Sequence, residues 1–497
     1  MADQDQERAI RRFKWVIGVP YFVQGTTSLT AVPLLYFIKN VLAMGDAGGQ
    51  LFDSLRSGGW LIKPLWGWLS DQVPIFGYRR KSWYVLMASL ALVFWSVSAV
   101  LAAVGVRVPL VYLLVFNLAF ATYAFVDVVC DAIMVEQGRR LQRVGSFVNF
   151  QWMVLSLANA VALYLSGWFQ EQIESDQLDY WAVFVLTGLP PLLTAMVGLR
   201  NIDETVVVAP SKPRPAPALK GADWTRVLAA ARSIRGRFAE FRASNRAIWL
   251  LMLFMFFWKF RPSVGFIERS YLIDVRGFQP SSFGIIFSVG GVSFLFSILV
   301  YRWVVRRFSQ VEWHEYLYAM VALGVLTFPL SFYFYLNPDH PWWRLFGVFQ
   351  TWPENLNPLP HWNRYEWFRL IVETVLGFAT IPAFLIPLTL AAETVKLQYA
   401  AVGYAFLMSL TNVTGVFEGV VGAGLYKLFS QPWMAWTLNA FQGTWFDISG
   451  VTDQRTLILE IFVYIGLVFT LLTIPFILLL KREFERQRMV IHLGGEQ

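Results

Sequence analysis

The chain alternates between long apolar runs and short polar or charged segments. A helix that crosses the hydrocarbon core of a bilayer needs about 20 mostly apolar residues, and runs of this length recur along the whole sequence. In the first half the pattern predicts spans at about 14–38, 50–69, 82–105, 109–136, 144–169 and 181–199. In the second half it predicts spans at about 246–272, 281–302, 313–336, 366–392, 399–428 and 456–480. We therefore expect an all-α integral membrane protein with twelve transmembrane helices.

Composition favours the same class. Of 497 residues, 56% are hydrophobic, 17% are aromatic and 15% are charged, a balance too apolar for a soluble protein of this length. The single cysteine, Cys130, lies in an apolar run and has no second cysteine with which to form an internal disulfide. The net charge of +8 comes from short basic clusters between the apolar runs. This distribution indicates membrane topology rather than nucleic-acid binding.

The basic clusters also predict orientation. The amino terminus, the loops after even-numbered spans and the carboxyl tail together hold most of the 41 lysine and arginine residues. The positive-inside rule assigns that side to the cytoplasm. We expect a multi-pass protein of a plasma or bacterial inner membrane, with both termini cytoplasmic.

A long polar segment divides the predicted spans into two groups of six. Residues 201–245 contain a proline cluster at 210–217 and then arginines from Arg226 to Arg242. This composition predicts a stiff linker followed by a basic amphipathic helix on anionic lipid headgroups. The expected organisation is an amino-terminal six-helix half at 1–200, a cytoplasmic linker at 201–245 and a carboxyl-terminal six-helix half at 246–497.

The loop after the second predicted span resembles the signature loop of the major facilitator superfamily, with extra residues before its second glycine. The residues that carry this resemblance, and that we take as gating candidates, are Lys63, Gly67, Asp71, Gly77, Arg79 and Arg80.

Several stretches resemble the folate-biopterin transporter family more specifically. The part of the loop from Val73 to Arg80 does so, as does the pair Asp127 and Asp131 in the fourth span. Weaker matches are Pro262-Ser263, Gly277-Phe278-Gln279-Pro280 and Phe406–Asn412. The resemblance implies a secondary transporter of two six-helix halves with substrate between them near the midplane. It also implies a folate- or pterin-like solute and no cofactor.

Two departures bear on the substrate. Lys259-Phe260-Arg261 stands where the family has a small uncharged pair, and Thr394–Gln398 replaces a Cys-Pro-Pro-Gly-type turn. Muropeptide permeases and acetyl-coenzyme A transporters carry a similar loop and aspartate pair, so they are alternatives.

Ionisable side chains inside a bilayer cost several kcal/mol and are functional candidates by default. The alternative at each position is a structural ion pair, and Asp53 and Arg56 could form one. A carboxylate can accept two hydrogen bonds from a pterin ring, and a guanidinium can bind a carboxylate tail in the same bidentate way. The candidate substrate-binding residues are Gln24, Arg56, Trp60, Asp127, Lys259, Arg261 and Asn412.

The two aspartates of the fourth span are expected to differ in role. In related facilitators a loop arginine pairs with an acidic residue of this span. We therefore expect Asp131, with Glu136 one turn on, to act in gating, and Asp127 to lie in the cavity. The candidates for proton coupling are Asp127, Glu268 and Glu418, and Glu268 is expected on the same helix face as Arg261.

Other patterns give weaker predictions. Gly415, Gly419 and Gly422 are more typical of close helix packing than of binding. The tryptophan-rich outer loop at 337–369 predicts an interfacial aromatic belt, or else a lid or partner-binding surface. An enzyme is disfavoured because the four histidines are not at metal-ligand spacing and no Walker or Gly-x-Ser-x-Gly motif occurs. A facilitator-type assembly factor or pigment carrier is a further alternative. We expect a small-molecule substrate and lipid contacts, without metal, cofactor or nucleic acid.

Overall fold

The computed structural model describes residues 2–140, 144–202, 204, 246–308, 310–336, 362–394, 400–447, 450 and 453–488. This part of the chain is helical, with turns between the helices and no named strand. The predicted linker beyond residue 204, most of the tryptophan-rich loop and residues 395–398 lie outside it.

The amino-terminal half, residues 2–202 of the described chain, consists of α-helices, short 3-10 turns and the π-helical segment η2 (Phe37–Val41). Its α-helices are α1 (Ala2–Thr26), α2 (Ala31–Tyr36), α3 (Asp46–Leu55), α4 (Lys63–Gln72), α5 (Lys81–Ala103), α6 (Pro109–Arg140), α7 (Val144–Glu174), α8 (Tyr180–Gly188) and α9 (Pro191–Asn201). Two 3-10 turns, η1 (Thr27–Thr30) and η3 (Gly58–Trp60), interrupt the first and second predicted spans.

The carboxyl-terminal half comprises the described residues from 246 to 488. Its α-helices are α11 (Arg246–Lys259), α12 (Gly265–Arg276), α13 (Pro280–Arg307), α14 (Trp313–Thr327), α16 (Arg364–Thr394), α17 (Ala400–Phe429), α18 (Ala435–Phe441) and α19 (Gln454–Arg486). The 3-10 helix η4 (Phe328–Phe334) extends α14.

Seven stretches of the described chain are long and apolar enough to cross a membrane by length and composition. They are Lys81–Ala103, Pro109–Gln137, Ser146–Glu174, Tyr180–Asn201, Pro280–Ser297, Trp313–Phe334 and Gln454–Arg486. Three other predicted spans are not continuous α-helices, because the chain breaks at η1, between α3 and α4, and between α11 and α12. The tenth and eleventh predicted spans lie within α16 and α17. The count of twelve stays a prediction.

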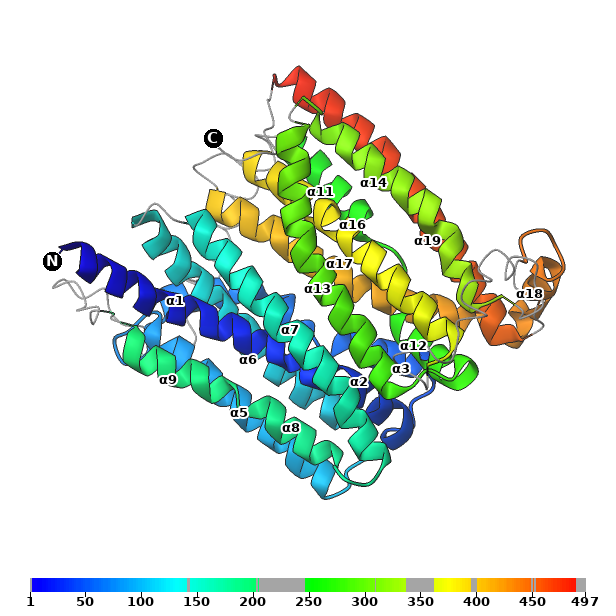
Figure 1. Ribbon diagram of the computed structural model, residues 1–497, viewed down its shortest axis with the longest axis horizontal. Helices are drawn as coiled ribbons and strands as arrows, with labels where there is room; N and C mark the ends of the chain where they lie inside the picture. Colours follow the sequence, from blue (N-terminus) through cyan, green and yellow to red (C-terminus); the bar gives the residue numbers. More distant parts are fainter. Residues whose placement is uncertain are drawn as a thin grey trace, which may run out of the picture.

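The long helices run side by side in two groups, and α7 and α13 meet where the groups touch (Figure 1). Both chain ends lie at the same end of the bundle, here called the terminus face, where α1 begins and α19 ends (Figure 1). The other end, here called the opposite face, carries α2, α12 and α18 (Figure 1).

Glycines let helices of the two halves approach closely. A Cβ on Gly167 of α7 would lie 2.7 Å from the carbonyl oxygen of Pro280 and 2.9 Å from the Cα of Gly284 in α13. A Cβ on Gly419 of α17 would lie 1.9 Å from the hydroxyl of Ser54 in α3. Side chains at these positions would push the halves apart.

The glycines of α17 were predicted to serve close packing. This is confirmed for Gly419 and Gly422, since a Cβ on Gly422 would lie 1.9 Å from the carbonyl oxygen of Ser263. Gly415 differs, because its nearest neighbour would be 3.8 Å away, at the Glu418 carboxylate.

Charged side chains join the halves at the opposite face. Arg455 of α19 binds Asp46 at the start of α3 with an Nε–Oδ2 distance of 2.9 Å, and binds Asp274 of α12 with an Nη1–Oδ2 distance of 2.9 Å. Lys39 also pairs with Asp274, and Tyr426 donates to Asp46.

Two further contacts between the halves lie deeper in the bundle. Arg269 binds Asp53 with an Nη2–Oδ2 distance of 2.9 Å, and the Phe266 amide donates to Gln50 at 2.8 Å. Within the described chain, the hydrogen bonds and ion pairs between the halves all belong to this set, which starts near mid-bundle and ends at the opposite face. The halves are therefore closed against each other on that face.

We predict that Gly167→Ala destabilises the protein. The added methyl would meet backbone atoms of α13 that cannot rotate away, and such overpacking costs about 1–3 kcal/mol. Thermal unfolding of the purified protein in detergent measures the effect. The matched control is Gly466→Ala in α19, where a Cβ meets nothing within 4 Å; there the better helix propensity of alanine should leave stability unchanged or slightly raised. Equal melting temperatures for the two variants would contradict the packing argument.

Candidate functional site

A polar cavity lies between the two halves near the middle of the bundle. Its volume is about 390 Å³, within the range of small-molecule sites. One wall comes from α3 and η3 and the other from α11, α12, α17 and the segment between α11 and α12. It is lined by Gln50, Asp53, Ser54, Ser57, Trp60, Lys259, Ser263, Gly265, Arg269, Thr411, Asn412, Gly415, Val416 and Gly419.

The break in the seventh predicted span forms part of this wall. Residues 260–264 are not helical, and Pro262 within them has no amide hydrogen to continue the helix ladder. The freed amide of Ser263 instead donates to the main-chain oxygen of Glu418 at 2.9 Å. Since Gly422 fits against the Ser263 carbonyl, the break is held firmly on α17.

The break corrects one expectation about helix faces. Arg261 and Glu268 were expected on one face of a continuous helix, but Arg261 lies in the break and Glu268 in α12. Glu268 binds Arg369 of α16 with an Oε1–Nη1 distance of 2.9 Å, and Arg369 also binds Glu373 at 2.8 Å.

Lys259 and Arg261 instead lie near Glu418. The Lys259 ammonium donates to the Thr411 carbonyl at 3.0 Å, and the Arg261 amide lies 3.4 Å from Glu418 Oε2. Among the described residues, neither side-chain cation has a carboxylate within ion-pair distance. Lys259 and Asn412 line the cavity, whereas Arg261 lies beside it.

Asp53 stands at the wall of the cavity between two guanidinium groups. Arg56 binds its Oδ1 at 2.8 Å and Arg269 binds its Oδ2 at 2.9 Å. The expected pair of Asp53 and Arg56 is therefore present, and Arg56 also lies over the Phe120 ring at 5.3 Å. Trp60 lines the cavity directly.

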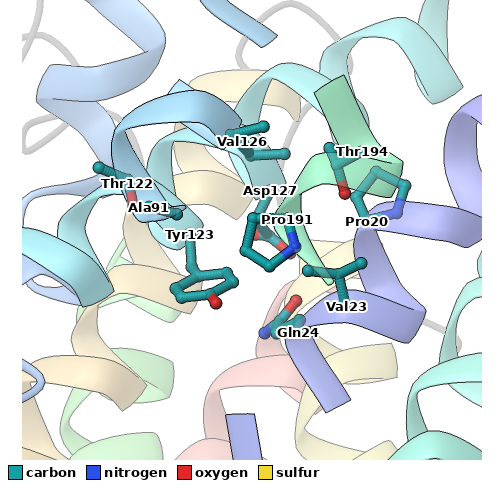
Figure 2. Close-up of a pocket in the computed structure, with 11 residues that line it drawn as sticks. Pro20, Val23, Gln24, Ala91, Thr122, Tyr123, Val126, Asp127, Pro191 and Thr194 are labelled. Carbon is teal, nitrogen blue, oxygen red and sulfur yellow. The ribbon is translucent and has the colours of Figure 1, made fainter. Parts of the chain in front are cut away.

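Asp127 and Gln24 lie outside this cavity, around a small pocket within the amino-terminal half (Figure 2). Its volume of about 10 Å³ is about that needed for one water molecule. Gln24 and Tyr123 point toward each other there (Figure 2). Asp127 is buried and binds Lys63 with an Oδ2–Nζ distance of 2.6 Å, and the same ammonium lies 4.7 Å from the centroid of the Trp60 ring. Lys63 and Trp60 thus connect the pocket to the cavity wall.

Asp131 has different partners from those expected of a gating residue. Tyr21 donates to it at 2.8 Å and Gln151 lies at 3.5 Å. The loop arginine Arg80 binds Glu136 instead, at 3.2 Å. Within the fourth span, the ion pair with the signature-loop arginine Arg80 therefore comes from Glu136, one turn beyond Asp131.

The signature loop forms a compact turn on the terminus face. Arg80 binds Asp71 at 2.6 Å, and Arg79 approaches Asp71 at 3.6 Å. Gly77 has a φ of 78°, a left-handed conformation that favours glycine. Gly67 packs near α6, since a Cβ there would lie 3.4 Å from Val128.

Several charged residues that form ion pairs were not predicted from the sequence. Those at the seam between the halves are Lys39, Asp46, Arg269, Asp274 and Arg455. Arg369 lies within the carboxyl-terminal half. Arg269 and Arg369 could have been identified from the sequence, because an ionisable residue within an apolar run is itself a functional candidate. The partners of Arg269 and Arg455 are too distant in the sequence for spacing to reveal them.

Comparison with known proteins gives a consistent result. The model of the BT1 family matches residues 24–331. The folate-biopterin transporter of Synechocystis sp. is 27% identical over 467 residues, which cover 93% of this chain and 80% of that protein. Probable folate-biopterin transporter 7 of Arabidopsis thaliana is 28% identical over 212 residues, which cover 42% of this chain and 46% of that protein.

Solved structures resemble the fold over nearly the whole chain. The POT family transporter PepTSo matches with a TM-score of 0.62 and 12% identity, covering 96% of this chain and 99% of that one. A bacterial homologue of the human lysosomal transporter Spinster, in an inward-facing and occupied conformation, matches with a TM-score of 0.56 and 14% identity, covering 97% and 98%. These likenesses show a fold of the major facilitator type.

We predict that Lys63→Met destabilises the protein strongly. It would leave the buried Asp127 carboxylate without its cation, and breaking such a pair costs about 3–5 kcal/mol. The double variant Lys63→Met with Asp127→Asn should recover much of the loss, because no uncompensated charge remains. Melting temperatures in detergent measure this, with Lys427→Met as an exposed control. A double variant no more stable than Lys63→Met would refute the pairing argument.

Proposed function

Because this chain belongs to the BT1 family, we propose that it moves a folate- or pterin-like solute, or another anionic and amide-rich organic solute, across a membrane by alternating access. The family resemblance carried by the signature loop and the span-four aspartates is confirmed. The family and the fold are those of membrane transporters.

One observation carries the proposal: a polar cavity of about 390 Å³ lies between halves that are closed against each other on the opposite face. A solute bound there touches both halves. Its binding can therefore change the conformational equilibrium of both halves, as alternating access requires. The closed seam contains reversible ion pairs and close glycine approaches, beside a buried apolar cluster to which both halves contribute.

The cavity wall suits a flat ring with an anionic end. Trp60 offers an aromatic face for stacking, and Asn412 offers both a donor and an acceptor. Lys259 supplies a cation without a carboxylate partner among the described residues. We propose that Lys259 and the neighbouring Arg261 bind the anionic end, and that Trp60 and Asn412 bind the ring.

The same wall accommodates two other solute classes. Muropeptides and acetyl-coenzyme A also carry anions beside amide groups, so a muropeptide or acetyl-coenzyme A type transporter remains the alternative. An assembly factor or pigment carrier would be supported by copurification of a stable partner without transport of any solute.

We propose that the terminus face is cytoplasmic, on the basis of the lysine and arginine distribution. The closed opposite face is then the exterior, and the conformation is inward-open. The contact of Arg80 with Glu136 lies on the cytoplasmic side in this orientation. We propose that Arg80, Glu136 and Asp131 act in closing the cytoplasmic side.

Proton coupling is proposed for carboxylates that share or lack a cation. Glu418 lies near two cations without a direct ion pair among the described residues. Glu268 shares Arg369 with Glu373. Asp127 shares Lys63, through a longer-range attraction, with Asp131. In each place protonation of the carboxylate removes a negative charge that the neighbouring cation would otherwise meet.

The substrate is tested by binding and uptake. Purified protein should be stabilised against heat by folic acid more than by the uncharged biopterin, because ligand binding to the folded state raises its stability. Lys259→Gln and Arg261→Gln should weaken folic acid binding about tenfold each, the value of one hydrogen bond to a charged group, and leave biopterin binding unchanged. Lys427→Gln is the control. Equal losses for both ligands would remove the case for a charge contact, and stabilisation by muropeptides or acetyl-coenzyme A alone would favour the alternatives.

Orientation is tested by cysteine labelling in a Cys130→Ala background. We predict that Arg214→Cys is unreactive to a membrane-impermeant maleimide in intact cells and reactive after permeabilisation. Ser430→Cys, which follows α17 at the opposite face, should react in intact cells. The reverse pattern would place the termini outside.

A further inference from the structure

Positive charge exceeds negative charge around the central cavity. Lys259 and Arg269 line it, and so does one carboxylate, Asp53. Arg56 binds Asp53. Beside Lys259 lie one more cation, Arg261, and one more carboxylate, Glu418. These four cations and two carboxylates leave an excess of two positive charges, which a ligand with a single carboxylate would neutralise only in part.

Asp53 is the only carboxylate of the described chain that binds Arg269 within ion-pair distance, and it has a second guanidinium partner of its own. The two partners differ in position, since Arg56 belongs to the same half as Asp53 and Arg269 to the other. An anion that takes over Arg269 would therefore leave Asp53 paired with Arg56. No charge would be left alone by the exchange, so its cost is small compared with the breaking of an isolated buried pair.

We propose that Arg269 is a second carboxylate-binding position in the cavity, and that the ligand class is a dicarboxylate. One carboxylate binds at Lys259, and the other replaces Asp53 on Arg269. This assignment rests on the proposed function for the first carboxylate and adds the second. The fixed fork of the guanidinium suits bidentate binding of a carboxylate, and Arg269 keeps its orientation through a hydrogen bond from Nε to the Gly265 carbonyl at 2.9 Å.

The exchange has a consequence for the seam. The pair of Arg269 and Asp53 is the ion pair of the seam that reaches the cavity, whereas Arg455 and Asp46 lie beyond it at the opposite face. A dicarboxylate that occupies Arg269 removes this tie between the halves. A monocarboxylate bound at Lys259 leaves it intact. Binding of the second carboxylate would thus weaken the closed seam at its cavity end.

Folic acid and pteroic acid test the proposal, because they share the pterin and aminobenzoyl groups but differ in their number of carboxylates. Folic acid carries two on its glutamate, whereas pteroic acid carries one, the benzoate that is an amide in folic acid. Equilibrium binding to the purified full-length protein should favour folic acid by about tenfold. Arg269→Gln should abolish this preference by weakening folic acid, while pteroic acid binding stays within twofold. Arg455→Gln is the matched control, since it also removes a cation bound to an aspartate of the other half but does not line the cavity; it should keep the preference.

A second variant distinguishes competition between Asp53 and the ligand for Arg269 from damage to the fold. Asp53→Asn removes the competing carboxylate while keeping the shape of the side chain, so it should tighten folic acid binding several-fold and leave pteroic acid unchanged. A merely structural role for the pair of Asp53 and Arg269 predicts weaker binding of both ligands in both variants. That result, or an unchanged preference in Arg269→Gln, would overturn the second position.

Cysteine labelling measures the effect on the seam separately from ligand binding. Ser270 is buried at the seam, and in Ser270→Cys with Cys130→Ala its labelling from the opposite face should rise with folic acid but not with pteroic acid. Labelling that is the same with both ligands would overturn the release of the tie. Failure of the unmodified protein to bind either ligand would instead count against the proposed function itself, whereas equal binding of both ligands would count only against the second carboxylate position.

Discussion

An ionised side chain inside this bundle requires a partner, because the surrounding hydrocarbon cannot solvate it. Much of the architecture follows from meeting that requirement. Lys63 and Asp127 tie α4 to α6, Glu268 and Arg369 tie α12 to α16, and Asp53 with Arg269 ties one half to the other. At the cavity, Lys259 has no carboxylate within ion-pair distance among the described residues. A negatively charged solute would supply the missing ion-pair partner.

Backbone breaks place the polar groups that this cavity needs. A continuous helix keeps its amides and carbonyls in its own ladder, whereas the break at Pro262 frees several of them at mid-bundle. The Ser263 amide finds the Glu418 carbonyl, and Gly422 provides the space that this approach requires. The proline in the break and the glycine in α17 therefore act together. Neither residue alone would hold Lys259 at the cavity wall.

The sequence predicted the membrane class, the all-helical fold and the position of most long helices, because these depend on local apolar runs. It also predicted the pair of Asp53 and Arg56, whose spacing puts them on one helix face. It did not predict the break between α11 and α12, and so it put Glu268 beside Arg261 rather than Arg369. The sequence also did not predict the ion pair of Arg455 and Asp46, for a different reason. Their pairing depends on how the two halves dock, and nothing in either local sequence encodes the distant partner.

Glycine approaches and ion pairs between the halves differ in a way that bears on how the protein can move. The approach of Gly167 to Gly284 depends on shape alone, so it can part without leaving a charge unpaired. The ion pairs cannot part so freely, since each separated charge needs water or a new partner. Lys39, Asp46, Asp274 and Arg455 are all partly exposed at the opposite face, where water can replace the lost partner. Asp53 and Arg269 lie deeper, at the cavity wall. Their side chains are exposed to a similar degree, but to the cavity that both of them line, so a bound solute can replace the partner that each loses when they separate.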